Sequence, residues 1–219
     1  MSPVLLISMA AAAAPPAPTH DQIAQVNWGP PTFHEHQLLG NVPVAQATID
    51  GVACFRGQAR VQPSPDQLLA VVTDIASTKT WSSAGIVDGR VLWSSEAGDR
   101  LHYFQVLDVP DWTLAANRYW FLSGKVERLS DGVRMRWTRL ENSAAYPELA
   151  QIRVQRPRAV EPPVNVGSWT FRIVPDGTEV DYVICTDFGG SMPDLLKNAA
   201  SRTALPGTIG DVVAEALRR

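Results

Sequence analysis

The sequence predicts an α+β domain in which a long antiparallel sheet is covered by one C-terminal helix. Many segments alternate apolar and polar residues with the period of a strand, and an apolar stripe of helical spacing occupies the last part of the chain. Turn residues separate the strand-like segments at short intervals. Connections this short leave no room for parallel crossovers, so the strands must be antiparallel.

Composition supports one folded unit and excludes several classes of protein. The chain has 219 residues, of which 45% are hydrophobic and 19% charged, so it can bury a sizeable core and is too apolar for an extended disordered protein. Its formal charge is −3, with no block of basic residues that would follow a phosphate backbone. We therefore expect no nucleic-acid partner.

Residues 1–20 resemble a targeting segment rather than part of the fold. An apolar run over residues 3–16 ends in small residues, as in a secretory signal peptide, although no Lys or Arg precedes Arg56. The run is too short for a helix that spans a bilayer, which needs about 20 residues. We interpret 1–20 as a signal peptide with a flexible lead-in, which implies a periplasmic or secreted protein. The alternative is an unstructured Ala/Pro-rich tail on a cytoplasmic protein.

The domain is expected over residues 21–219 and opens with an arm and a hairpin. Pro30 and Pro31 interrupt any regular element in 21–43, so this segment is predicted as one short helix or an irregular arm. Strands are predicted over 44–49 and 52–61, because the Asp50-Gly51 dipeptide between them favours a tight type I′ turn.

A helix follows over 64–76. Ser64 can cap its first turn, Pro65 suits the first helical position, and Gln67 completes a capping box ahead of an apolar run.

Strand-like segments then fill the remainder of the predicted sheet, which spans 44–187. They are expected at 86–94, 100–107, 118–129, 133–140, 151–156, 167–174 and 178–186. In 133–138 and 168–173 the apolar and polar residues alternate strictly, so one face of the sheet is apolar and the other wet.

The predicted C-terminal helix occupies 190–219, with Ser191 as its cap and Pro206-Gly207 as a kink or an interruption. One helix is narrow compared with so many strands, so part of the apolar face is left for other contacts. If the sheet curls around the helix, an interior cavity for an apolar molecule results; a plain packed core is the equal alternative.

Several segments of the chain form a recognisable set: the strand and helix of 59–75 followed by Trp81, HYF at 102–104, NRY at 117–119, GSW at 167–169, and DFGGSMP at 187–193. In this order they resemble START-type lipid-transfer domains of the START/Bet v 1-like superfamily. The last segment is the most specific, because it resembles the family's entry into its final helix. Tyr119 stands where the family usually has Asp, and 156–166 resembles a Pro-rich insertion.

The resemblance covers residues 44–219 and implies a bacterial-type single-domain member with the helix-grip fold. In that fold a curved antiparallel sheet wraps around the C-terminal helix and leaves a hydrophobic tunnel. The implied function is non-catalytic binding, and possible transport, of a lipid or other hydrophobic small molecule, with transient contact to a membrane surface and a monomeric state. The alternative is an enzyme that uses the tunnel as its active site, because the superfamily includes cyclases, aromatases and hydrolases.

The resemblance also selects candidate tunnel residues. Arg118 shares a strand face with Trp120 and is either an anchor for a ligand's polar group or part of a structural ion pair. Aromatic and Met side chains cover large apolar areas with few specific demands, and residues of the final helix would form the opposite wall. The predicted lining comprises Trp81, Tyr103, Arg118, Trp120, Met135, Trp137, Trp169, Phe171, Tyr182, Met192, Leu195, Leu196 and Ala199.

Cys54 and Cys185 are the two cysteines of the chain. In the resembled fold the strand before the first long helix pairs with the last strand, which brings the two cysteines within one residue of register. A disulfide on the outer face of the sheet is one outcome, in agreement with an oxidising compartment, and two free thiols are the other.

Motifs for metal binding or catalysis are missing from the sequence. His34 and His36 would share one face of a strand without a third ligand nearby, and two cysteines cannot form a four-ligand zinc site. We find no nucleophile elbow, phosphate-binding loop, dinucleotide fingerprint or HExxH sequence. We therefore expect no metal, no cofactor and no catalytic residue.

Overall fold

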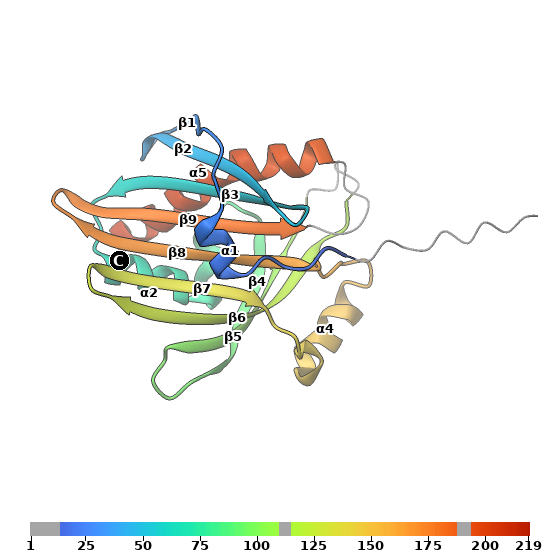
Figure 1. Ribbon diagram of the computed structural model, residues 1–219. Helices are drawn as coiled ribbons and strands as arrows, with labels where there is room; N and C mark the ends of the chain where they lie inside the picture. Colours follow the sequence, from blue (N-terminus) through green and yellow to red (C-terminus); the bar gives the residue numbers. More distant parts are fainter. Residues whose placement is uncertain (1–13, 110–114, 188–193) are drawn as a thin grey trace, which may run out of the picture.

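The computed structural model describes residues 14–109, 115–187 and 194–219, and of 194–203 it gives the course of the backbone alone. Its centre is a nine-stranded antiparallel sheet with the order β1-β2-β3-β9-β8-β7-β6-β5-β4. The strands are β1 (Thr32–His36), β2 (Gly40–Ile49), β3 (Val52–Val61), β4 (Ile86–Ser94), β5 (Arg100–Leu107), β6 (Arg118–Leu129), β7 (Gly132–Arg139), β8 (Val164–Val174) and β9 (Gly177–Asp187). Figure 1 shows that the sheet is strongly curved.

Local sequence explains the hairpins. Asp50 and Gly51 have φ values of 49° and 84°, the left-handed conformation that a tight turn between β2 and β3 requires. Long-range pairing then joins β3 to β9, so the first hairpin lies against the last one. The predicted bounds of β4, β5 and β6 agree with the structure, and the antiparallel arrangement is confirmed.

Five α-helices lie around the described part of the sheet. They are α1 (His20–Gln25), α2 (Pro65–Thr73), α3 (Thr78–Trp81), α4 (Pro147–Gln155) and α5 (Asp194–Arg218), with short 3-10 turns at Ile75–Ser77 and Ser143–Ala145. The capping box of Ser64 and Gln67 starts α2, as predicted. Helix α5 continues through Pro206 without the interruption that the sequence suggested.

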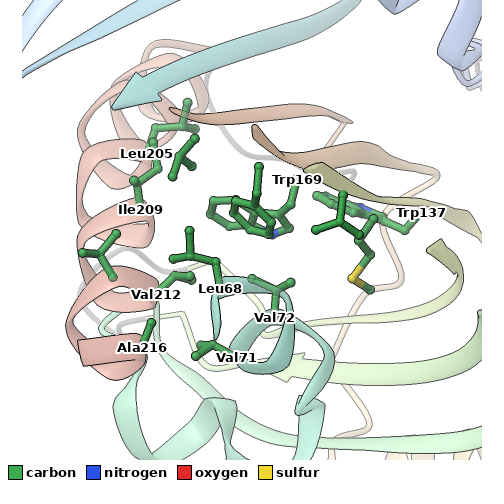
Figure 2. Close-up of a cluster of buried hydrophobic side chains, with 14 of the residues drawn as sticks. Leu68, Val71, Val72, Trp137, Trp169, Leu205, Ile209, Val212 and Ala216 are labelled. Atoms are coloured by element: carbon green, nitrogen blue, oxygen red, sulfur yellow. The ribbon is translucent and has the colours of Figure 1, made fainter. Parts of the chain in front are cut away.

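The main core lies between the inner face of the sheet and helices α2 and α5. Leu68 and Val71 of α2 and Ile209 of α5 are fully buried there against aromatic residues of β7 and β8. Figure 2 shows this layer, with Leu205, Ile209 and Val212 on α5 directed toward the side of the core that holds Trp169. A Cβ atom on Gly57 of β3 would lie 2.9 Å from Ile209 Cδ1, so this glycine lets α5 approach the sheet closely.

Ion pairs tie the C-terminal end of α5 to the end of α2. Arg219 donates to Glu215 at 2.9 Å and to Asp74 at 2.8 Å, and Arg218 donates to both oxygens of Glu215. The Arg218 hydrogen bonds, followed by those of Arg219, lower the pKa of Glu215 from 4.5 to about 2. The end of α5 is therefore fixed to its neighbour independently of the apolar core.

Cys54 and Cys185 face each other across β3 and β9 and form a disulfide. The bond lies on the outer face of the sheet, but it is fully buried, because Ile23 of α1 and Val26 cover that face. In Figure 1, α1 crosses the outer face while α2 and α5 lie behind the sheet. The N-terminal arm therefore closes a second, smaller core around the disulfide.

Two predictions from the sequence are wrong. Residues 151–155 of the strand predicted over 151–156 belong to α4, which Pro147 begins and in which Leu149 and Ile152 are buried three positions apart on one side. These two side chains pack on Phe104 and Phe121, so α4 covers the outer face of β5 and β6. In the arm of 21–43 the predicted short helix is present as α1, but the remainder is not irregular, because 32–36 form the edge strand β1.

Candidate binding cavity

A cavity of about 350 Å³ lies between the inner face of the sheet and the helices α2, α3 and α5. This volume is at the lower end of the range, about 300–1,000 Å³, of pockets that enclose a drug-sized molecule. Its described lining comprises Val72, Ile75, Thr78, Trp81, Ser82, Ala84, Ile86, Tyr103, Gln105, Leu107, Trp120, Leu122, Met135, Trp137, Asn165, Trp169, Tyr182, Ile184, Thr186, Ala204, Leu205, Thr208 and Val212.

Stacked rings form the floor of the cavity on β7, β8 and β9. The Trp169 and Tyr182 rings are 3.9 Å apart and nearly parallel, and the Trp137 ring stacks on Tyr182 with centroids 6.2 Å apart. Gly167 makes this arrangement possible, because a Cβ atom there would lie 2.4 Å from the Trp137 ring. The floor is therefore a stack of aromatic rings, whose faces pack on one another, held in register by the sheet.

Polar groups of the described lining are neutral. No Asp, Glu, Lys, Arg or His belongs to the part of the wall that the structure describes. Asn165 Oδ1 accepts a hydrogen bond of 2.8 Å from Trp137 Nε1, whereas the buried Nε1 of Trp120 has no hydrogen-bond partner among the described residues. The described surface of the cavity can thus pack against apolar groups and can donate and accept a few hydrogen bonds.

Two tyrosines contribute hydroxyl groups to the wall. Burial raises the pKa of Tyr103 and of Tyr182, and the proximity of Tyr182 raises that of Tyr103 further. Both phenols therefore stay protonated and neutral throughout the physiological range of pH. They can form hydrogen bonds, but they are poor bases or nucleophiles.

Seven of the thirteen predicted lining residues border the cavity: Trp81, Tyr103, Trp120, Met135, Trp137, Trp169 and Tyr182. Phe171 does not; it is fully buried beside Trp169, one ring farther along the stack. Met192 lies outside the described residues, and so do the side chains of Leu195, Leu196 and Ala199 on α5. The α5 wall that is described consists of Ala204, Leu205, Thr208 and Val212.

Arg118 is buried but is not among the lining residues. Its guanidinium donates to the backbone carbonyls of Ala116 and Asn117 at the start of β6. Burial lowers the pKa of this side chain. These contacts place the guanidinium against the backbone that precedes β6. The role of Arg118 as a ligand anchor or as a member of a structural ion pair stays a prediction.

Asn165 is the main lining residue that sequence reasoning missed. It lies in the second position of β8, two residues before the start predicted for that strand, inside a segment interpreted as an insertion. A signal was present, because a single polar residue stands between Val164 and Val166 in an otherwise apolar run. A polar residue in such a run must find a partner inside the fold.

Within the His34-Glu35-His36 motif, His36 packs against α5. The motif forms most of β1, and the ring of His36 lies over Gly210 of α5, where a Cβ atom would be 2.2 Å from the ring. Within the described ranges, no group of three or more His, Cys, Asp or Glu residues is arranged to hold a metal ion. Over the same ranges, no helix is long and apolar enough to span a membrane.

A curved antiparallel sheet wrapped around a C-terminal helix, with a cavity between them, defines a helix-grip protein. The particular variant is the START type. A STAR-related lipid transfer protein from Xanthomonas axonopodis, fragment 25–204, matches with a TM-score of 0.69 at 19% identity, over 87% of this chain and 100% of that one. Human StAR-related lipid transfer protein 5 matches with a TM-score of 0.71 at 14% identity, over 90% of each chain. The chain therefore has the START helix-grip fold, which confirms the fold that its motifs implied.

An enzyme shares the fold as well. The aromatase/cyclase Zhui from Streptomyces sp. R1128 matches with a TM-score of 0.54 at 11% identity, over 77% of this chain and 95% of that one. No protein-family model and no curated protein sequence matches the chain. Structures with this fold thus include both lipid-transfer proteins and an aromatase/cyclase.

Proposed function

We propose that the protein is a non-catalytic carrier that binds one lipid or other hydrophobic small molecule in the cavity and transports it. The observation that supports this proposal best is the cavity of about 350 Å³, whose described lining combines stacked aromatic rings with neutral polar groups. Burial of apolar ligand surface there would supply most of the binding free energy, at about 25 cal/mol per Å².

A cyclase-, aromatase- or hydrolase-like enzyme is the second candidate. The structural likeness to an aromatase/cyclase and the hydroxyls of Tyr103 and Tyr182 in the cavity wall favour it. Against it, the raised pKa of both tyrosines leaves neither as a ready base near neutral pH. The described lining offers no other titratable side chain.

We further propose that the protein acts in an oxidising compartment, as a monomer that contacts membrane surfaces transiently. The disulfide between Cys54 and Cys185 supports the compartment, since such bonds persist in the periplasm and outside the cell. The apolar run at residues 3–16 supports export by the same route. Fractionation of cells that express the full chain tests the compartment, and the N-terminal sequence of the exported form tests whether the apolar run is removed on export.

Native mass spectrometry of the purified protein, followed by organic extraction, is the first test of binding. We expect a stoichiometric hydrophobic adduct, or one that forms when the protein is incubated with a panel of lipids. Displacement of N-phenylnaphthylamine, a neutral probe that fluoresces in apolar surroundings, then measures affinity. Extracts analysed before and after incubation would reveal a new product if the protein were an enzyme.

A matched pair of variants ties binding to the cavity. Ile184→Trp adds a large ring at a position that lines the cavity, whereas Ile173→Trp makes the same change at a side chain that is 65% exposed on β8. We expect the first to abolish probe binding and the second to leave it intact, with both variants folded by circular dichroism. Equal binding by the two variants would refute a ligand site in this cavity.

A further inference from the structure

We infer that the ligand enters and leaves the cavity between α5 and the corner formed by residues 82–85, and that two hydrogen bonds between Ser83 and Asp211 control its passage. The corner connects α3 to β4. The two hydrogen bonds are called the latch below. This inference rests on the proposed binding function and adds to it the route of the ligand and the residues that set its rate.

The cavity reaches the protein surface where the corner meets α5. Among the described lining residues, only Ala84 of the corner and Ala204 of α5 are exposed, and the others are buried or partly buried. Gly207 and Asp211 follow Ala204 on α5 at three and seven positions, so the three residues lie along one side of the helix. The mouth of the cavity therefore lies between the corner and this side of α5.

The latch joins the corner to the same side of α5. Asp211 Oδ2 accepts a hydrogen bond of 2.6 Å from the backbone N–H of Ser83 and another of 2.7 Å from the Ser83 hydroxyl. Such short distances are typical of donors to a carboxylate. Over the residues that the structure describes, no other hydrogen bond connects the corner to α5. Release of this one carboxylate therefore frees the corner from the helix.

The corner is attached to elements that can move. Helix α3 before it has 4 residues, and β4 after it is the last strand of the sheet and pairs with β5 alone among the described strands. The pairing with β5 is also irregular directly after Ile86, the first residue of β4. Short elements and sheet edges have few stabilising contacts and open locally at low cost in free energy. The corner can thus move away from α5 while the central strands stay in place.

Trp81, the residue before the corner, separates the cavity from the outside. Its side chain lines the cavity, and it also lines an outer hollow between α3 and α5, together with Thr80, Asp211, Ala214, Glu215 and Arg218. A ring that borders both spaces forms the partition between them. Movement of the adjoining corner would shift this partition and widen the mouth at Ala84 and Ala204.

The rates of ligand exchange test the latch. Stopped-flow fluorescence of N-phenylnaphthylamine gives kon, koff and Kd for the wild-type protein and for Asp211→Ala, which removes both hydrogen bonds. We expect kon and koff each to rise about tenfold in the variant. Kd should stay within about twofold, because the latch is closed in the free and in the occupied protein and is broken only during passage.

Asp131→Ala is the matched control for this change. Asp131 also accepts two hydrogen bonds, of 2.8 Å and 2.7 Å from Arg172, and it does not line the cavity. The control variant loses a comparable pair of contacts on the surface, so both rates should keep their wild-type values.

A covalent lock tests the route itself. A Cβ atom on Gly207 would lie 3.8 Å from Ser83 Oγ, so cysteines at these two positions are close enough to form a disulfide. In Ser83→Cys combined with Gly207→Cys, we expect oxidation to lower kon and koff by about tenfold or more relative to the reduced form. Wild-type protein with and without the same reductant is the control, because it contains the Cys54–Cys185 bond alone. Intact mass and thiol titration establish the new bond, and circular dichroism establishes the fold of each variant.

The outcomes separate the inference from the proposed function. If the probe binds but its rates are the same in the wild type, in Asp211→Ala and in both forms of the double variant, the inference is overturned and the proposed function stands. A change in Kd that comes from koff alone would make Asp211 a ligand contact and would also overturn the inference. If the wild-type protein binds no probe, the proposed function fails, and the inference fails with it.

Discussion

Removal of the disulfide should strongly destabilise the protein. The bond joins residues separated by 131 positions, and closing a loop of that length lowers the chain entropy of the unfolded state by about 5 kcal/mol at 25 °C. Measured disulfides typically contribute about 2–4 kcal/mol, so we expect Cys54→Ala combined with Cys185→Ala to lower the free energy of unfolding by roughly 3 kcal/mol. For a chain of this size, that is a decrease in Tm of about 6–12 °C.

Thermal and urea denaturation followed by circular dichroism measure the change. The control is wild-type protein that is unfolded and refolded in reductant. It keeps both sulfur atoms, which are fully buried, and lacks only the bond between them. Its stability therefore reports the contribution of the cross-link without the loss of side-chain packing that the double variant also suffers. It should match the double variant to within the small cost of the lost sulfur contacts. If oxidised wild type, reduced wild type and double variant all unfold at the same temperature, the argument from loop closure is wrong.

Three further changes probe α5. Glu215→Gln removes the charge that pairs with Arg218 and Arg219 and should lower the free energy of unfolding near pH 6. The loss should be only about 1 kcal/mol, because both arginine side chains are partly exposed to solvent. Since the pKa of Glu215 is depressed to about 2 in the folded protein, the stability advantage of the wild type should disappear as the pH falls from 4.5 toward 2. A difference from wild type that does not depend on pH would contradict this assignment. Gly57→Val should cost about 1–3 kcal/mol and weaken probe binding, because its Cβ would lie 2.9 Å from Ile209 Cδ1. Gly207→Ala should instead raise the free energy of unfolding by up to about 1 kcal/mol, and with it the Tm, because Ala favours a helix more than Gly does. The added carbon fits, since only Ser83 Oγ lies near it, at 3.8 Å. A loss of stability in this variant would show that the helix requires glycine at this position.

Local signals in the sequence predicted most of the sheet. The bounds of β4, β5 and β6 follow from alternation and turn residues, and the start of α2 from its capping box. Helix α4 was missed because it has few apolar residues. Leu149 and Ile152 form the buried side of this helix only because β5 and β6 supply an apolar surface for them to pack on. Strand β1 was missed because the segment after Pro31 becomes a strand through pairing with β2.

The candidate site was only partly predictable. Trp137, Trp169 and Tyr182 could be predicted as lining residues because they are large aromatic residues in segments that alternate between apolar and polar positions, and the period of a strand sets which face each side chain occupies. That same period could not exclude Phe171, which shares the face of Trp169 but lies one ring beyond the cavity. Nor could it find Asn165, whose role depends on a hydrogen bond to a residue 28 positions away.

The sequence by itself determined the antiparallel sheet, the C-terminal helix and, through its motifs, the START-type fold, because alternation, turns and caps act between residues close along the chain. Tertiary structure decided that Cys54 and Cys185 meet in register, that α1 buries their bond, and that Asn165 accepts a hydrogen bond from Trp137 in the wall of a cavity. These relations depend on the curvature of the sheet and on the distance at which α5 packs against it. Contacts between residues far apart in the chain set both quantities, and no local pattern encodes them.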